Sequence, residues 1–246
     1  MHTIVVANNK GGVGKTTIAT QIAFHLRHAG HSVVAVDLDG QVNLTSALPG
    51  VRVVGNALGM VETGAVPPFT TEPGELVLIE GDAEVPVSSA DAVLRGTAQG
   101  LRSIDGPEFC VIDTPPTFSA VVYGAMLSAD YMLAPIELKK FSLDGVEGVL
   151  KAFVQVQELN EGITFLGLLP SRFDAVKQSE RDTLQLVAES YSALIIPHAI
   201  RNRVGYEMAE AEGLPVFEVT TRSGKEAAAE FGAFFAWLRT ALQEEA

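Results

Sequence analysis

The sequence is poor in cysteine and in positive charge, and both shortages narrow what the protein can be. Cys110 is the only cysteine among the 246 residues, so no disulfide can form within the chain. Lysine and arginine number 17 against 30 acidic residues, which gives a net charge of -13 at pH 7. General binding to polyanions needs a basic surface, so any contact with nucleic acid is expected from a local patch.

Long apolar runs and a secretory signal are also missing. No uninterrupted apolar stretch approaches the roughly 20 residues that a membrane-spanning helix requires. The start, MHTIVVAN, has neither the charged region nor the long apolar region of a signal peptide. Together with the single cysteine, these absences predict a cytoplasmic protein. Because the chain has no visible linker or internal repeat, we expect one domain over residues 1–246.

Short β-branched runs alternate along the chain with longer helical patterns. The runs are 3–7, 32–39, 76–81, 109–116, 131–137, 163–170 and 193–197, and the helical patterns lie near 15–29, 89–103, 117–128, 142–160, 178–191, 204–212 and 223–243. Because the strands are apolar on consecutive residues, they are expected to be covered on both faces. The sequence therefore predicts an α/β fold, doubly wound, with a mostly parallel sheet and ligands beyond the carboxyl ends of its strands.

The strongest motif follows the first strand. Gly14, Lys15 and Thr16 form the GKT of a P-loop, in which backbone amides surround phosphate oxygens, the lysine reaches the terminal phosphates and the threonine hydroxyl binds Mg²⁺. A strand before the loop and a helix after it provide the context that this motif requires. The general pattern asks for glycine at position 9, whereas this chain has Asn9 followed by Lys10.

Two carboxylates follow buried strands at the same edge of the predicted sheet. Asp113 ends the fourth run, directly before TPP, where it can hold Mg²⁺ near the phosphates. Asp39 ends the second run and is expected to line the same site, with Asp37 as a supporting neighbour. A different interpretation makes Asp39 the cap of a short helix over 43–48, although Asn43 suits that role equally well.

Several segments together resemble one family over essentially the whole chain. KGGVGKTT (10–17) resembles the deviant Walker A loop of the ParA/MinD family of dimeric ATPases, and DLDGQVNLT (37–45) resembles that family's DxDPQxNLT segment, with Gly40 in the usual proline position. FCVIDTPP (109–116) is similar to the family's Walker B strand and second switch. PIELKKFSLDGV (135–146) and LIIPHAIR (194–201) match later landmarks in order and spacing.

The resemblance implies a role for each site residue. In that family the extra lysine, here Lys10, crosses an ATP-dependent dimer interface to reach the partner's nucleotide, and Asp39 positions the attacking water beside Mg²⁺. Arg172 and Pro197 lie near where the family holds adenine, and the absence of an NKxD guanine motif agrees with ATP. The full expected nucleotide-binding set is Gly11, Gly12, Val13, Gly14, Lys15, Thr16, Thr17, Arg172 and Pro197, with Thr16, Asp39 and Asp113 at the metal.

A local basic stretch follows the seventh run and is the candidate DNA-binding surface. It contains Arg201, Arg203, Arg222 and Lys225, and Arg201 matches a position where relatives carry a DNA-contacting arginine. The same stretch has acids that offset these charges, namely Glu207, Glu210, Glu212 and Glu218. His198 replaces the arginine common at its position, which weakens the expected patch.

The resemblance implies two functional classes. In a ParA-type plasmid or chromosome partition ATPase, the ATP-bound dimer binds DNA without sequence preference on the nucleoid, and a ParB-like protein stimulates an otherwise slow hydrolysis. In a MinD-like ATPase, the protein cycles on and off the membrane through a basic C-terminal helix. Other relatives use the same ATPase to position protein clusters. Glu244 and Glu245 near the C-terminus disfavour binding to anionic lipid. Because the chain begins at its first strand, we expect a small, Soj-like ParA without an N-terminal DNA-reading domain.

Overall fold

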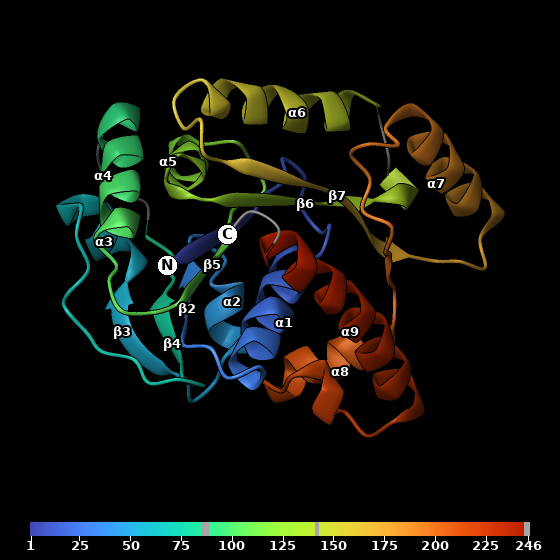
Figure 1. Cartoon of the computed structure of the whole chain (residues 1–246), viewed down its shortest axis with the longest axis horizontal. Helices are drawn as coiled ribbons and strands as arrows, with labels where there is room; N and C mark the ends of the chain where they lie inside the picture. The colour runs from blue at the N-terminus through green and yellow to red at the C-terminus, as the bar shows by residue number, and fades with distance from the viewer. Residues whose placement is uncertain (85–88, 141–142, 244–246) are drawn as a thin grey trace.

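The computed structural model describes residues 1–84, 89–140 and 143–243, and these residues are built around an eight-stranded sheet (Figure 1). The strands are β1 (His2–Val6), β2 (Val33–Asp37), β3 (Arg52–Asn56), β4 (Leu76–Glu80), β5 (Phe109–Asp113), β6 (Tyr131–Glu137), β7 (Thr164–Phe173) and β8 (Ile200–Arg201). Their order across the sheet is β3-β4-β2-β5-β1-β6-β7-β8, and all neighbours are parallel. The prediction of a mostly parallel sheet is confirmed.

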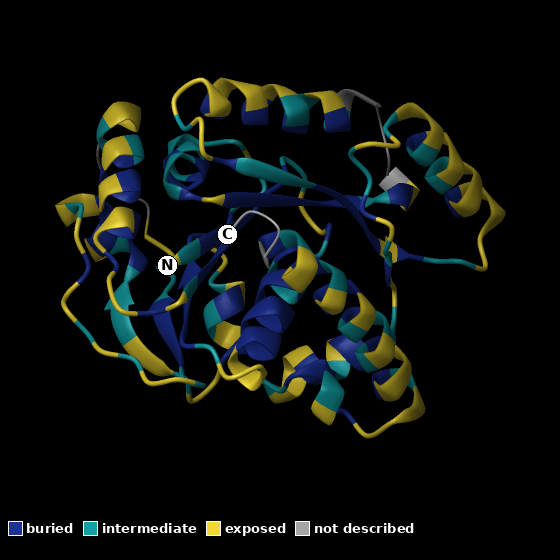
Figure 2. Cartoon of the chain, in the orientation of Figure 1, coloured by how far each residue is buried: buried dark blue, intermediate teal, exposed yellow. Residues whose placement is uncertain are grey.

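Helices cover both faces of the sheet and enclose two apolar cores (Figures 1 and 2). One face carries α3 (Ala57–Thr63), α4 (Ala90–Arg102), α5 (Ala120–Ser128), α6 (Leu143–Gln157) and α7 (Gln178–Ser190). The other carries α1 (Lys15–His28), α2 (Asn43–Ala47), α8 (Val204–Glu212) and α9 (Arg222–Gln243). The central strands are buried almost without a break because both faces are covered, as their continuous apolar sequences predict.

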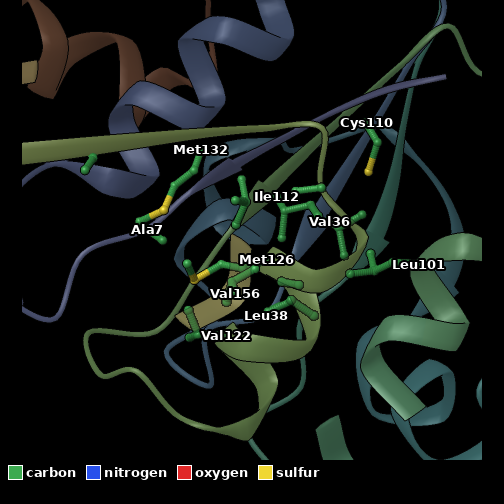
Figure 3. Close-up of a cluster of buried hydrophobic side chains, with 14 of the residues drawn as sticks. Ala7, Val36, Leu38, Leu101, Cys110, Ile112, Val122, Met126, Met132 and Val156 are labelled. Carbon is green, nitrogen blue, oxygen red and sulfur yellow. The ribbon is translucent and has the colours of Figure 1, made fainter. Parts of the chain in front are cut away.

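The lone cysteine is part of the first of these cores. Figure 3 shows Cys110 and Ile112 of β5 in the same cluster as Val36 of β2 and as Met126 of α5. Cys110 is completely buried, and this burial raises the pKa of its thiol above the usual value. It therefore behaves as a small apolar core residue.

Two parts of the sheet differ from the sequence prediction. The sequence pattern does not predict β3, because this edge strand has exposed or half-buried residues and lacks a continuous apolar run. It does not predict helix α3, which follows β3 directly, either. The predicted strand at 193–197 is wrong: the only ladder contact there joins Leu168 and Ile195, and the regular strand is β8 at Ile200–Arg201. The sheet edge therefore lies several residues later in the chain than predicted.

The structure also bears on the membrane question. Within the described ranges, no helix is both long enough and apolar enough to cross a membrane. The acidic pair Glu244 and Glu245 lies outside the described residues.

A buried histidine joins α1 to α9. His25 is 8% exposed and is surrounded by the rings of Phe217, Phe231 and Phe235, at centroid distances of 4.9, 4.8 and 5.1 Å. Its Nδ1 atom lies 2.8 Å from the carbonyl oxygen of Gln21, so this nitrogen carries the proton in the neutral ring. Burial lowers the pKa of His25 from 6.5 to about 4, and the hydrogen bond to Gln21 only partly opposes that shift.

Mild acid is therefore expected to destabilise the fold through His25. The unfolded chain protonates this ring near pH 6.5 and the folded chain only near pH 4, so stability falls as the pH drops through that window. From pH 7 to pH 5 the loss is up to about 2 kcal/mol, measurable by urea unfolding at each pH. His25→Phe should remove this part of the pH dependence, whereas His28→Phe should keep most of it, because His28 is only a lesser cause of the lowered His25 pKa. Equal pH dependence in wild type and His25→Phe would contradict the assignment.

Candidate functional site

The glycine-rich loop lies between β1 and α1, at the carboxyl edge of the sheet. Gly12 and Gly14 have φ angles of +76° and +85°, a left-handed conformation that favours glycine. Gly14 is also the N-cap of α1 and makes no side-chain cap bond, so the first N–H groups of the helix remain for a ligand. In the sheet Val6 pairs with Asp113, which brings the end of β5 beside the start of this loop.

Lys15 is a buried cation inside the loop. Its side chain is largely enclosed, with the residue 6% exposed, and Nζ donates a hydrogen bond of 3.2 Å to the carbonyl oxygen of Lys10. Burial lowers the pKa of Lys15, while the negative charges of Asp113 and Asp39 act in the opposite direction. The loop itself thus holds the positive charge of Lys15 close to the carboxylates of Asp113 and Asp39.

Asp113 and Thr16 meet where β5 reaches the first turn of α1. The Thr16 hydroxyl donates to Asp113 Oδ2 at 2.6 Å, and the Thr114 N–H donates to Oδ1 at 3.1 Å. Asp113 is fully buried, which raises its pKa from 3.8 to about 7, against the opposing effect of the Thr16 hydrogen bond. A hydroxyl and a carboxylate at this spacing are the oxygen ligands that Mg²⁺ prefers, so the pair fits a divalent cation.

The metal-binding capacity of the site depends on more than side chains. In the described part of the chain, no group of three or more histidine, cysteine, aspartate or glutamate residues is arranged to hold a metal ion. A cation bound by Thr16 and Asp113 would therefore need water or phosphate oxygens to complete its coordination. That is the usual arrangement for Mg²⁺ beside a nucleotide.

Asp37 is a buried anchor for the loop that carries Asp39. Its Oδ2 accepts hydrogen bonds from both the N–H and the hydroxyl of Thr45, each at 2.9 Å, and its Oδ1 accepts from the N–H of Asp39 at 3.1 Å. The Thr45 hydroxyl in turn accepts a 2.9 Å bond from the N–H of Gly81, which follows β4. Burial raises the pKa of Asp37, and the Thr45 bonds oppose that shift. These contacts fix both ends of the loop.

Neither Asp39 nor Asn43 caps α2. The N-cap is Val42, with a left-handed φ of +58° and no side-chain cap bond. Asp39 is half-buried, and its Oδ1 accepts a 3.1 Å bond from the N–H of Gln41 inside the loop. The Asp39 side chain is thus not occupied with a helix end and lines a hollow beside the P-loop.

That hollow brings together most of the residues predicted for phosphate and metal. It is lined by Gly11, Gly12, Gly14, Lys15, Thr16, Thr17, Asp39 and Arg172. Val13 is buried, and its carbonyl oxygen accepts a hydrogen bond of 2.5 Å from Ser171 of β7. Lys10 lies elsewhere within the single chain: it lines a smaller hollow together with Glu137 of β6 and Gly145 of α6.

A second hollow adjoins the first on the β8 side. It is built from Ser171, Tyr206 and the segment 200–203, and it shares Gly14, Thr17, Arg172 and Glu210 with the first. Pro197, one of two residues predicted near adenine, is exposed and lines neither hollow. The sequence assigns Arg201 and Arg203 to DNA and does not place the segment 200–203 beside the P-loop, because it predicts the edge strand at 193–197.

The basic residues predicted for DNA are held by acids of α9. Arg203 bonds Glu226 and, at 3.3 Å, Glu230, while Arg201 lies 3.6 Å from Glu230. Arg222, whose side chain is 94% exposed, pairs with Glu226 at 3.1 Å. The patch is consequently more neutral than its arginines alone suggest, but the acids that pair with them are Glu226 and Glu230 of α9 and not the acids at 207–218 named from the sequence. Lys225 is exposed on the same helix.

Comparison with known proteins agrees with this architecture. Residues 4–216 match the family described as CobQ/CobB/MinD/ParA nucleotide binding domain. Protein IncC of Escherichia coli is 31% identical over 99% of this chain and 70% of its own length. The chromosome-partitioning ATPase Soj of Thermus thermophilus is 32% identical over 80% of this chain and 82% of its own length.

The fold also matches a solved structure that contains a nucleotide. Cobyrinic acid a,c-diamide synthase from Mycobacterium smegmatis, with bound ADP and magnesium, superposes with a TM-score of 0.69 at 24% identity, covering 86% of this chain and 91% of that one. The family match extends over most of the chain and includes the P-loop, β5 and the sheet edge. The protein therefore belongs to the CobQ/CobB/MinD/ParA family of nucleotide-binding ATPases.

Proposed function

We propose that the protein is a ParA-type partition ATPase that binds MgATP, closes into a homodimer and binds DNA without sequence preference. Among its relatives, Soj is named for chromosome partitioning, and IncC matches nearly the whole of this chain. The observation that carries the proposal is the pair of lysines in one loop. Lys15 faces the phosphate hollow, whereas Lys10 lies outside it.

The chemistry of the proposed reaction follows from the charges around the hollow. The glycine-loop amides, Lys15 and the N-terminus of α1 offer positive charge to the phosphates. Mg²⁺, held by Thr16 and Asp113 with Asp39 nearby, would offset the phosphate charge. Asp39 orients the attacking water, and Asp37 fixes the loop that carries it. Hydrolysis is slow until a ParB-like partner acts on the dimer.

The proposed location of the protein is the cytoplasm, on the nucleoid. Two related alternatives are MinD-like cycling on a membrane and the positioning of a protein cluster by the same ATPase. The basic residues of α9 and β8 favour DNA, because Arg201, Arg222 and Lys225 are all exposed to solvent. A dimer would bring two such patches to one DNA molecule and strengthen a weak contact.

Dimerisation is expected to require Lys10. ATP favours the closed dimer only to the extent that it binds the dimer more tightly than the monomer. A lysine that reaches the partner's phosphates supplies such a difference in affinity. With a slowly hydrolysed ATP analogue, light scattering should show wild type doubling in mass. Lys10→Ala should remain monomeric and keep most of its nucleotide affinity. Lys151→Ala, an exposed change on α6, is the control and should dimerise normally. A Lys10→Ala variant that dimerises like wild type would remove the trans role.

DNA binding is expected to depend on the exposed cations and to be limited by the acids beside them. Arg222→Ala with Lys225→Ala should weaken binding to any sequence and flatten the salt dependence, which changes by roughly 0.9 in log–log slope per neutralised phosphate. Glu226→Gln should strengthen binding, because it releases Arg222 and leaves Arg203 paired only with Glu230. These affinities can be measured by fluorescence anisotropy with labelled duplexes.

The control for this experiment is Arg95→Ala on α4, which lies on the other face of the sheet and should not alter DNA affinity. The patch is excluded if the double variant and Glu226→Gln bind DNA as wild type does. The proposed nucleotide switch is excluded if wild type binds equally tightly without ATP.

A further inference from the structure

Glu210 occupies a distinctive position on the rim of the nucleotide site. It lies on α8 and, among the residues that the structure describes, it lines both adjoining hollows together with Gly14, Thr17 and Arg172. The first hollow contains Lys15 and Thr16, and the second is closed by β8 and Tyr206. Glu210 therefore lies at the boundary between the phosphate hollow and its neighbour.

One hydrogen bond connects Glu210 to the P-loop helix. The Thr17 hydroxyl donates to Glu210 Oε2 at 3.4 Å, which is long for a bond between oxygens. Glu210 is exposed, and the described residues place no arginine or lysine within ion-pair distance of it. Its carboxylate is thus available to a stronger hydrogen-bond donor.

The chemistry of a nucleotide limits what this carboxylate can bind. An ionised carboxylate only accepts hydrogen bonds, and phosphate oxygens are acceptors too, so the phosphates repel it. Sugar hydroxyls are donors, and an acidic side chain on a ribose hydroxyl is a known way to recognise nucleotides. A nucleotide with its phosphates at Lys15 and its base in the second hollow would have its sugar at the boundary, beside Thr17 and Glu210.

We propose that Glu210 accepts a hydrogen bond from a ribose hydroxyl of the bound nucleotide and makes the protein select ATP over deoxyadenosine triphosphates. The proposal rests on the nucleotide placement given under the proposed function, but not on dimerisation or DNA binding. On binding, the ribose hydroxyl replaces Thr17 as the donor to Glu210. Thr17 is then free to turn its hydroxyl toward the phosphates.

The test compares ATP with 2′-deoxy-ATP and 3′-deoxy-ATP by calorimetry, in Mg²⁺ and without DNA. Wild type should bind ATP roughly tenfold more tightly than at least one of the two analogues, as expected for one hydrogen bond to a charged acceptor. Glu210→Ala should weaken ATP binding by about the same factor and leave that analogue unchanged, so that the preference disappears. Glu212→Ala, an exposed change of equal charge on the same helix, should retain the preference.

Three results would overturn the proposal. The first is that wild type binds ATP and both analogues equally, and the second is that Glu210→Ala keeps the wild-type preference. If Glu210→Ala binds ATP and the analogues more tightly by one common factor, Glu210 only repels the phosphates. Lys15→Ala serves as the control for placement: if it loses all three ligands while Glu210→Ala keeps the preference, the nucleotide site stands and only the role of Glu210 fails.

Discussion

The hydrogen bond between the Thr16 hydroxyl and Asp113 is the contact around which the site is organised. It joins the first turn of helix α1 to the end of β5, a strand inside the buried part of the sheet. A fully buried carboxylate is costly unless positive charge or hydrogen-bond donors surround it, and here it has two donors with Lys15 nearby. The fold thus holds in place a carboxylate whose negative charge a bound cation would balance.

A second buried carboxylate extends this organisation to the neighbouring strands. Asp37 and Asp113 occupy paired positions on β2 and β5, so the two loops that follow lie side by side. Asp37 binds Thr45 and the backbone of Asp39, and Thr45 binds Gly81 after β4. Movement of the Asp39 loop is therefore coupled to three strand ends. At the β8 edge of the sheet, Glu230 of α9 accepts a hydrogen bond from the Arg201 N–H and forms an ion pair with Arg203. These contacts connect β8 to the C-terminal helix.

Sequence alone predicted the parts of the molecule that local patterns determine. The buried strands carry continuous apolar runs, and the GKT loop carries glycines where the backbone has positive φ angles. Both patterns can be recognised in the sequence itself. Strand β3 is half-exposed, and β8 is two residues long, so neither has such a pattern. The boundary position of Glu210 and the pairing of Arg203 with Glu226 arise from helices that meet only in the folded chain.

We expect Lys15 to hold the nucleotide and Asp39 to act only on its hydrolysis. The most direct measurement is MgATP affinity and single-turnover hydrolysis for Lys15→Ala and Asp39→Ala beside wild type. Lys15→Ala should lose ATP binding, whereas Asp39→Ala should bind ATP within a few-fold of wild type and hydrolyse it on the order of 100-fold more slowly. Wild-type turnover in Asp39→Ala, or undiminished ATP affinity in Lys15→Ala, would contradict this division of roles.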